Sequence, residues 1–128
     1  VRETNPEVFS WVRDAMTHYW GGPKLTNNPL LHFKLVDATL DEFEGNRSNA
    51  LRAALKTAIE RLRPEGERKF TSDWILYNIL DLKFVQGEKV RDVARKLSVS
   101  EADLYRKQRV ALENVTQIII EIEEEYAA

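Results

Sequence analysis

The sequence contains no cysteine, and only five glycines and four prolines among its 128 residues. The absence of cysteine excludes disulfides, thiolate zinc sites and cysteine nucleophiles. So few glycines and prolines leave little material for the many turns of an all-β domain. No apolar run approaches the ~18–20 residues that cross a bilayer, and no segment has the pattern of a signal peptide. We therefore expect no membrane association and a cytoplasmic location.

The net charge is also small, at −2. A chain that is not a polycation can bind nucleic acid only through a local basic patch. Its length suits one domain with a real core and is short for two. Because the first residue is Val1 rather than methionine, we expect the chain to be the N-terminal module of a longer protein.

Apolar residues recur at helical spacing along most of the chain, and no segment shows the alternation typical of a strand. Capping residues mark helix starts at Asn5, Asn28, residues 46–48, residues 71–72 and Ser100. The breaks fall at Gly21-Gly22-Pro23, Pro64 and Gly87. We predict one compact all-α domain of about six helices over residues 1–128, with an N-terminal helical part (1–64) and a helix-turn-helix part with a long last helix (70–126).

Residues 87–106 have the pattern of a helix-turn-helix. Val99 is an apolar plug between two helices, and Ser100 with Asp103 forms a capping box that starts the second one. Leu104 then packs back onto the first helix. The narrow buried face of that first helix comprises Val90, Val93, Ala94 and Leu97.

The stretch from Asp81 to Val115 resembles the fourth conserved region of bacterial sigma factors. In that family a helix ending in a Leu-Arg-Phe-like sequence is followed by a glycine-containing loop, a short Val-Ala-like helix and a capped recognition helix. The matching residues here are Leu82-Lys83-Phe84, Gly87, Val93-Ala94, Val99-Ser100, Leu104 and Ala111-Leu112. The resemblance implies a helix-turn-helix that binds double-stranded DNA in transcription regulation.

The segment from Leu104 to Leu112 is also similar to a second group, the sigma-like helical modules at the N-termini of large bacterial multidomain proteins. In that group the module precedes NTPase, repeat or other effector regions. The layout of the helices within residues 11–62 resembles theirs. This resemblance leaves open an alternative function, a protein-interaction or adaptor module of a larger signalling protein that does not bind DNA.

Projected at 100° per residue, the last helix has an outer side that a DNA groove would meet. The residues expected at base edges are Ala102, Tyr105, Arg106 and Arg109. Those expected on phosphates are Lys89, Arg91, Arg95, Lys96 and Lys107. Between Lys83 and Arg109 eight basic residues face four acidic ones, a local charge of +4, whereas the remainder of the chain is negative. This asymmetry is typical of a DNA-binding patch.

Two carboxylates depart from the sigma-factor pattern. Glu101 and Asp103 occupy positions that carry basic, base-reading side chains in that family. Carboxylates repel phosphate, although they also suit the positive end of a helix dipole. The helix-turn-helix motif is therefore compatible with either of two functions, DNA binding or protein binding.

No catalytic set is recognisable, so we expect no enzymatic activity and no cofactor. His18 and His32 are the only histidines, and neither has metal-ligand spacing to acids. A group of acids in a loop is expected to be solvated rather than to bind a cation: Asp37, Asp41, Glu42 and Glu44. We also expect the three tryptophans, Trp11, Trp20 and Trp74, to lie in the core or at its edge.

The apolar stripe of the last helix continues through Val115, Ile119 and Ile122. The simpler interpretation is that this helix folds back over the N-terminal helices and fills their core. The alternative is self-association through the C-terminal helix, because Ile120 widens the apolar face beyond one stripe. We expect the intramolecular arrangement.

Overall fold

The computed structural model describes residues 5–127, and these residues form an all-α structure without strands. The ends of the predicted domain, residues 1–4 and 128, lie outside the described residues. The α-helices are α1 (Pro6–Thr17), α2 (Pro23–Thr26), α3 (Lys34–Asp37), α4 (Arg47–Glu60), α5 (Ile75–Ile79), α6 (Val90–Leu97) and α7 (Glu101–Ala127). Single 3-10 turns cover Pro29–His32, Leu40–Phe43 and Ser72–Trp74, and a π-helical segment covers Leu80–Val85.

Local capping chemistry explains where the longer helices begin. The side chain of Asn5 accepts hydrogen bonds from the backbone N–H groups of Glu7 and Val8, at 2.9 and 3.3 Å. The side chain of Asn46 does the same for Asn49 at 3.0 Å. Each bond satisfies a donor that has no partner inside the helix. The predicted starts of α1 and α4 are thereby confirmed.

The predicted second and fourth helices differ from those observed. The second is split, because Phe33 has an extended ψ of 151° that separates the turn Pro29–His32 from α3. A further short helix, α2, precedes it. The fourth begins as a 3-10 turn, passes through α5 and ends as the π-helical segment. The side chain of Thr71 accepts no backbone N–H of this helix, and its hydroxyl donates to the Asp73 carboxylate.

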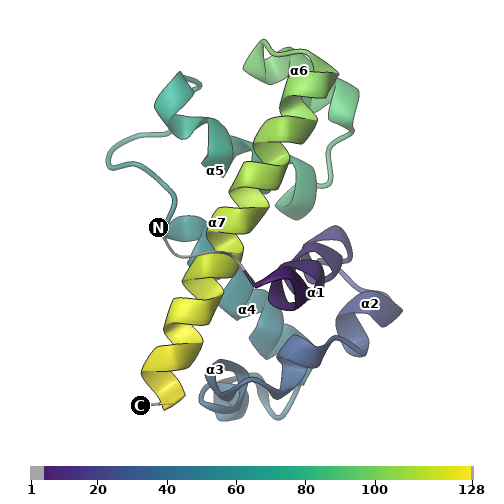
Figure 1. Cartoon of the computed structure of the whole chain (residues 1–128), viewed down its shortest axis with the longest axis vertical. Coiled ribbons are helices and arrows are strands. Elements are labelled where there is room, and N and C mark those ends of the chain that lie inside the picture. The colour runs from purple at the N-terminus through teal and green to yellow at the C-terminus, as the bar shows by residue number, and fades with distance from the viewer. Residues whose placement is uncertain (1–4, 128) are drawn as a thin grey trace.

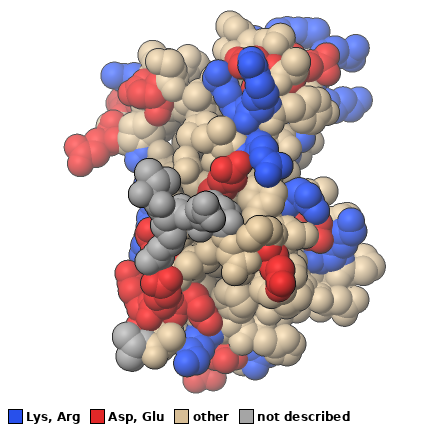
Figure 2. All heavy atoms as spheres, viewed as in Figure 1, with Lys and Arg blue, Asp and Glu red and all other residues tan. Residues whose placement is uncertain are grey.

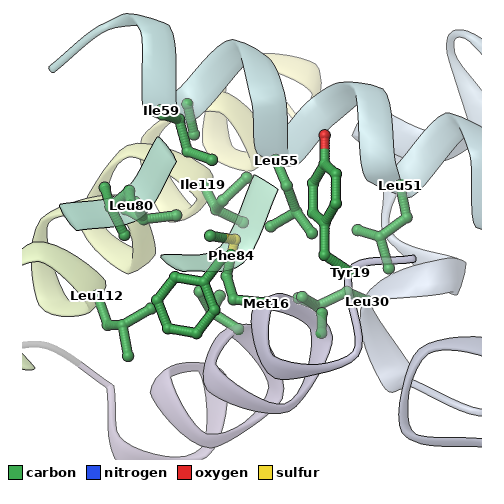
Figure 3. Close-up of a cluster of buried hydrophobic side chains, with 14 of the residues drawn as sticks. Met16, Tyr19, Leu30, Leu51, Leu55, Ile59, Leu80, Phe84, Leu112 and Ile119 are labelled. Atoms are coloured by element: carbon green, nitrogen blue, oxygen red, sulfur yellow. The ribbon is translucent and has the colours of Figure 1, made fainter. Parts of the chain in front are cut away.

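Helix α7 runs the length of the molecule and organises both ends of it (Figure 1). It contacts α6 and packs on α1, α3, α4 and α5 along its length. In Figure 3 side chains from α1, α4, the π-helical segment and α7 converge on one core, with Met16, Leu55, Phe84 and Ile119 among them. The predicted packing of the last helix over the N-terminal helices is confirmed.

The apolar face that favoured self-association packs largely within the chain itself. Ile119 is 1% exposed, and Ile120 is partly buried against the same core. The extra width of the stripe therefore serves packing against several helices of the chain itself. Within residues 5–127, no helix combines the length and the apolar character needed to cross a membrane.

The tryptophans do not share one environment. Trp74 is fully buried and Trp11 is partly buried at the edge of the core. Trp20 is 66% exposed, so the prediction that it lies in the core or at its edge was wrong. Its ring lies outside because the indole N–H donates to the carbonyl oxygen of Val85 at 2.8 Å and the guanidinium of Arg52 covers the ring at 5.3 Å.

A second, smaller apolar cluster holds the helix-turn-helix together. It is formed by Ile79, Leu82, Val93, Ala94, Leu97 and Leu104. Residues 79–84, from the end of α5 into the π-helical segment, link the two clusters, since Ile79 and Leu82 belong to the smaller one and Leu80 and Phe84 to the larger one. The helix-turn-helix is thus fixed to the N-terminal helices by one segment as well as by α7.

Glu123 holds the start of α3 against the end of α7. Its two carboxylate oxygens accept hydrogen bonds from the backbone N–H groups of Lys34 and Leu35, each at 2.9 Å. Replacing Glu123 by alanine is expected to lower the free energy of unfolding by about 1–2 kcal/mol, as for loss of an N-cap. Urea unfolding measures this, with the exposed Glu125 replaced by alanine as the control. Equal stability of the two variants would contradict the role of Glu123.

Candidate nucleic-acid interface

The helix-turn-helix is formed by α6, a tight turn and the start of α7. Ser98 adopts the left-handed conformation, with φ of 57°, and ends α6. Val99 follows, partly buried against the small cluster, and its N–H donates to the carbonyl of Ala94 at 3.0 Å. Leu104 is fully buried against the same cluster. The two helices therefore brace each other through the residues that the sequence predicted.

The predicted capping box at the start of α7 is only half formed. The Ser100 hydroxyl accepts a hydrogen bond from the N–H of Asp103 at 3.0 Å. The Asp103 carboxylate does not return a bond to Ser100, because it accepts from Arg106 at 2.7 Å and lies 3.1 Å from the Lys107 ammonium. The hydrogen bond that Lys107 donates lowers the pKa of the Asp103 carboxyl, and the bond from Arg106 lowers it further. Together they outweigh the opposite effect of desolvation. This carboxylate is therefore charged at neutral pH.

The four residues predicted at base edges all lie on the exposed side of α7, as expected: Ala102, Tyr105, Arg106 and Arg109. The side chains of Arg106 and Arg109 are 78% and 69% exposed. Each is also engaged within the chain, since Arg106 pairs with Asp103 and Arg109 pairs with Glu113 at 3.1 Å. The Arg109 guanidinium also lies 5.0 Å from the ring of Phe9 on α1.

The five residues predicted on phosphates divide into two groups. Lys96 pairs with Glu88 at 2.7 Å, and Lys107 pairs with Asp103. Three are exposed and have no acidic partner among the described residues: Lys89, Arg91 and Arg95. Arg91 and Arg95 are separated by one turn on the outer side of α6, opposite its buried face. These three cations are available to an anionic partner without breaking an existing ion pair.

Charge is distributed unevenly along the molecule. Figure 2 shows Lys and Arg gathered at the end where α6 lies, with some acids among them. The opposite end of α7 carries the acidic run Glu121, Glu123, Glu124 and Glu125. A duplex approaching this molecule would be attracted to the α6 end and repelled from the other.

Lys83 is a residue whose position the sequence did not reveal. The π-helical turn, with the N–H of Gln86 donating to the carbonyl of Asp81 at 2.8 Å, places Lys83 beside α7. Its ammonium donates to the Gln108 side-chain oxygen at 2.6 Å and lies 5.0 Å from the Tyr105 ring. Partial burial lowers its pKa. The only sequence signal was its place in the Leu82-Lys83-Phe84 motif.

The arrangement is suited to binding an anionic surface. Among residues 5–127, no group of three His, Asp or Glu side chains is placed to hold a metal ion. Exposed guanidinium and ammonium groups on two braced helices can donate hydrogen bonds to phosphate oxygens. Comparisons with family models, with curated proteins and with solved structures find no match for this chain.

Proposed function

We propose that the chain is a DNA-binding module, with a role in transcription regulation, that places α6 and the first turns of α7 on duplex DNA. The observation that carries the proposal is a set of exposed cations without an acidic partner in residues 5–127, Lys89, Arg91 and Arg95, on a well-braced helix-turn-helix. The resemblance to the fourth region of sigma factors supports the same surface. In this proposal α6 binds the phosphate backbone, and Tyr105, Arg106 and Arg109 face the groove.

The proposal predicts binding that weakens steeply with salt. With about five phosphate contacts, the slope of log K against log salt is expected to be about −4 to −5, a loss of roughly 10²–10³-fold between 50 and 200 mM salt. Fluorescence anisotropy of a labelled duplex measures the affinity at each salt concentration.

Replacing Arg106 and Arg109 by alanine is expected to weaken DNA binding at least tenfold. Replacing Arg91 and Arg95 by glutamine is expected to reduce the slope of log K against log salt by about 2.

A charge-matched control is a double variant away from the interface, Lys34→Gln with Arg61→Gln. Both side chains are exposed and neither lies on α6 or α7. Its affinity should stay within about twofold of the wild type, since distant exposed charges are screened. No binding by the wild type at low salt would remove the DNA proposal.

Asp103 offers a test in which DNA affinity should rise rather than fall. Because it holds Arg106 and Lys107 in ion pairs and carries a negative charge itself, Asp103→Asn should raise DNA affinity by about fivefold at low salt. The capping bond is kept, since it uses the backbone N–H of residue 103. Asp14→Asn on α1, which removes a carboxylate 3.8 Å from Arg13, is the matched control and should leave affinity unchanged. Unchanged or weaker binding by Asp103→Asn would contradict this interface.

The alternative function, a protein-interaction or adaptor module, is favoured by one feature beside the same motif. Phe70 is 57% exposed and borders a groove of about 260 Å³ whose lining includes Ile75, Leu97, Val99 and Lys107. Exposed aromatics beside a groove with both apolar and polar walls are common in protein interfaces. A stable oligomer by light scattering, together with absence of DNA binding, would favour this function over the first.

A further inference from the structure

A groove separate from the outer side of α6 lies between the chain after α1 and the π-helical segment. It has a volume of about 420 Å³, and its lining includes His18, Tyr19, Trp20, Lys83, Phe84 and Gly87. This volume falls within the range of small-molecule sites, roughly 300–1,000 Å³. Its wall combines aromatic rings with a few polar groups, which is the usual composition of such sites.

Trp20 gives the groove a fixed aromatic ring. Its indole N–H is bound to the Val85 carbonyl at 2.8 Å, and its ring meets that of Tyr19 edge to face, with centroids 5.0 Å apart. These contacts fix the orientation of a side chain that is nevertheless 66% exposed. The Arg52 guanidinium lies 5.3 Å from the ring centroid, and the rest of the ring is open to solvent. A large ring that is oriented and mostly exposed can stack on a planar ligand with little further loss of side-chain entropy.

Two cations near this groove have no carboxylate partner among the described residues: Arg52, over the Trp20 ring, and Lys83, in the groove lining. No described carboxylate lies within 4 Å of Lys83, whose hydrogen-bond partner is the amide oxygen of Gln108. Arg52 likewise donates to neutral acceptors, the Tyr19 carbonyl at 2.6 Å and the Asn49 side-chain oxygen at 2.7 Å. A partly desolvated cation without a carboxylate partner gains most from an anion that reaches it. An anion is therefore the complementary ligand group.

We propose that this groove binds a small planar aromatic anion, its ring against Trp20 and its charged group on the Lys83 ammonium. Aromatic and anionic character are both required, because one wall offers a ring and the other an unpaired cation. The site uses none of the cations of α6, although Lys83 lies 5.0 Å from the ring of Tyr105 on the proposed DNA surface. Variants of α6 are therefore needed to separate the two sites.

Two probes of this class, adenosine 5′-monophosphate and 1-anilinonaphthalene-8-sulfonate, are titrated into the full chain by calorimetry. At least one should bind saturably in the submillimolar range. When adenosine 5′-monophosphate binds, adenosine and ribose 5-phosphate should each bind at least tenfold more weakly, since each lacks one of the two groups. Lys83→Met should weaken probe binding at least tenfold, and Trp20→Leu should weaken it severalfold. Lys83→Arg keeps the positive charge and should therefore still bind the probe.

Lys34→Gln is the matched control, because the Lys34 backbone binds Glu123, roughly 22 Å along α7 from Gln108. It should leave probe affinity unchanged. Arg91→Gln with Arg95→Gln should also leave it unchanged while weakening DNA binding, which separates this site from the DNA surface. Failure of both probes to bind in the submillimolar range, or equal binding by wild type and Lys83→Met, would overturn the proposal.

Discussion

Replacing Arg68 by methionine is expected to lower the free energy of unfolding by about 3 kcal/mol, because it leaves a buried carboxylate without its principal partner. The Arg68 guanidinium lies 2.8 Å from the Asp81 carboxylate, whose side chain is only 5% exposed. It also donates to the side-chain oxygen of Asn78 at 2.9 Å. Lys56 is the other cation near Asp81, at 3.9 Å, too far for a good hydrogen bond.

The expected loss of unfolding free energy lies at the lower end of the range measured when one partner of a buried ion pair is removed. That range is about 3–5 kcal/mol when both partners are buried, and Arg68 itself is 32% exposed. Asn78 would lose a donor as well, although its own amide still donates to the Lys69 carbonyl at 2.9 Å. The connector after α4 would then be held to α5 by fewer long-range bonds.

Arg63 is a matched control on the same connector. Like Arg68 it lies over an aromatic ring, 5.4 Å from that of Trp74, but it has no carboxylate partner among the described residues. Arg63→Met should therefore lower the free energy of unfolding by only about 0.5–1 kcal/mol. In urea unfolding, Arg68→Met combined with Asp81→Asn should be more stable than the sum of the two single losses predicts. A loss below about 1 kcal/mol for Arg68→Met would contradict the role of this pair.

The contrast between Asn46 and Arg68 shows which parts of the fold the sequence could predict. Asn46 acts on a backbone N–H three residues away, so capping chemistry alone identifies the start of α4. Arg68 lies in a segment that looks like a polar connector, and its partner Asp81 is 13 residues away in a π-helical turn. A bond of that kind depends on tertiary packing, which local patterns do not encode.

The same distinction applies to the candidate interface. Helical projection predicted correctly that Arg106 and Arg109 are exposed, because exposure on a helix follows from periodicity. It did not predict that Arg109 lies 5.0 Å from the ring of Phe9, which is 100 positions earlier in the chain. It also did not predict the exposure of Trp20, since aromatic composition favours burial and the ring is held outside by contacts with Val85 and Arg52, which are distant in sequence.

Replacing Leu104 by alanine is expected to lower the free energy of unfolding by about 3 kcal/mol, within the range of 2–5 kcal/mol for buried leucines. Leu104 is fully buried in the cluster that holds α6 against α7. The matched control is Val110→Ala on the same helix, because Val110 is 48% exposed and should lose less than about 0.5 kcal/mol.

The manner of unfolding is as informative as the size of the loss. Because α7 runs through both apolar clusters, weakening the smaller one should lower the stability of the whole chain in a single transition. Circular dichroism reports all helices, and fluorescence includes Trp74, which lies in the larger cluster. The two signals should therefore change at the same urea concentration in Leu104→Ala. If helix content fell first, the helix-turn-helix would unfold independently, and α7 would not transmit stability between the two clusters.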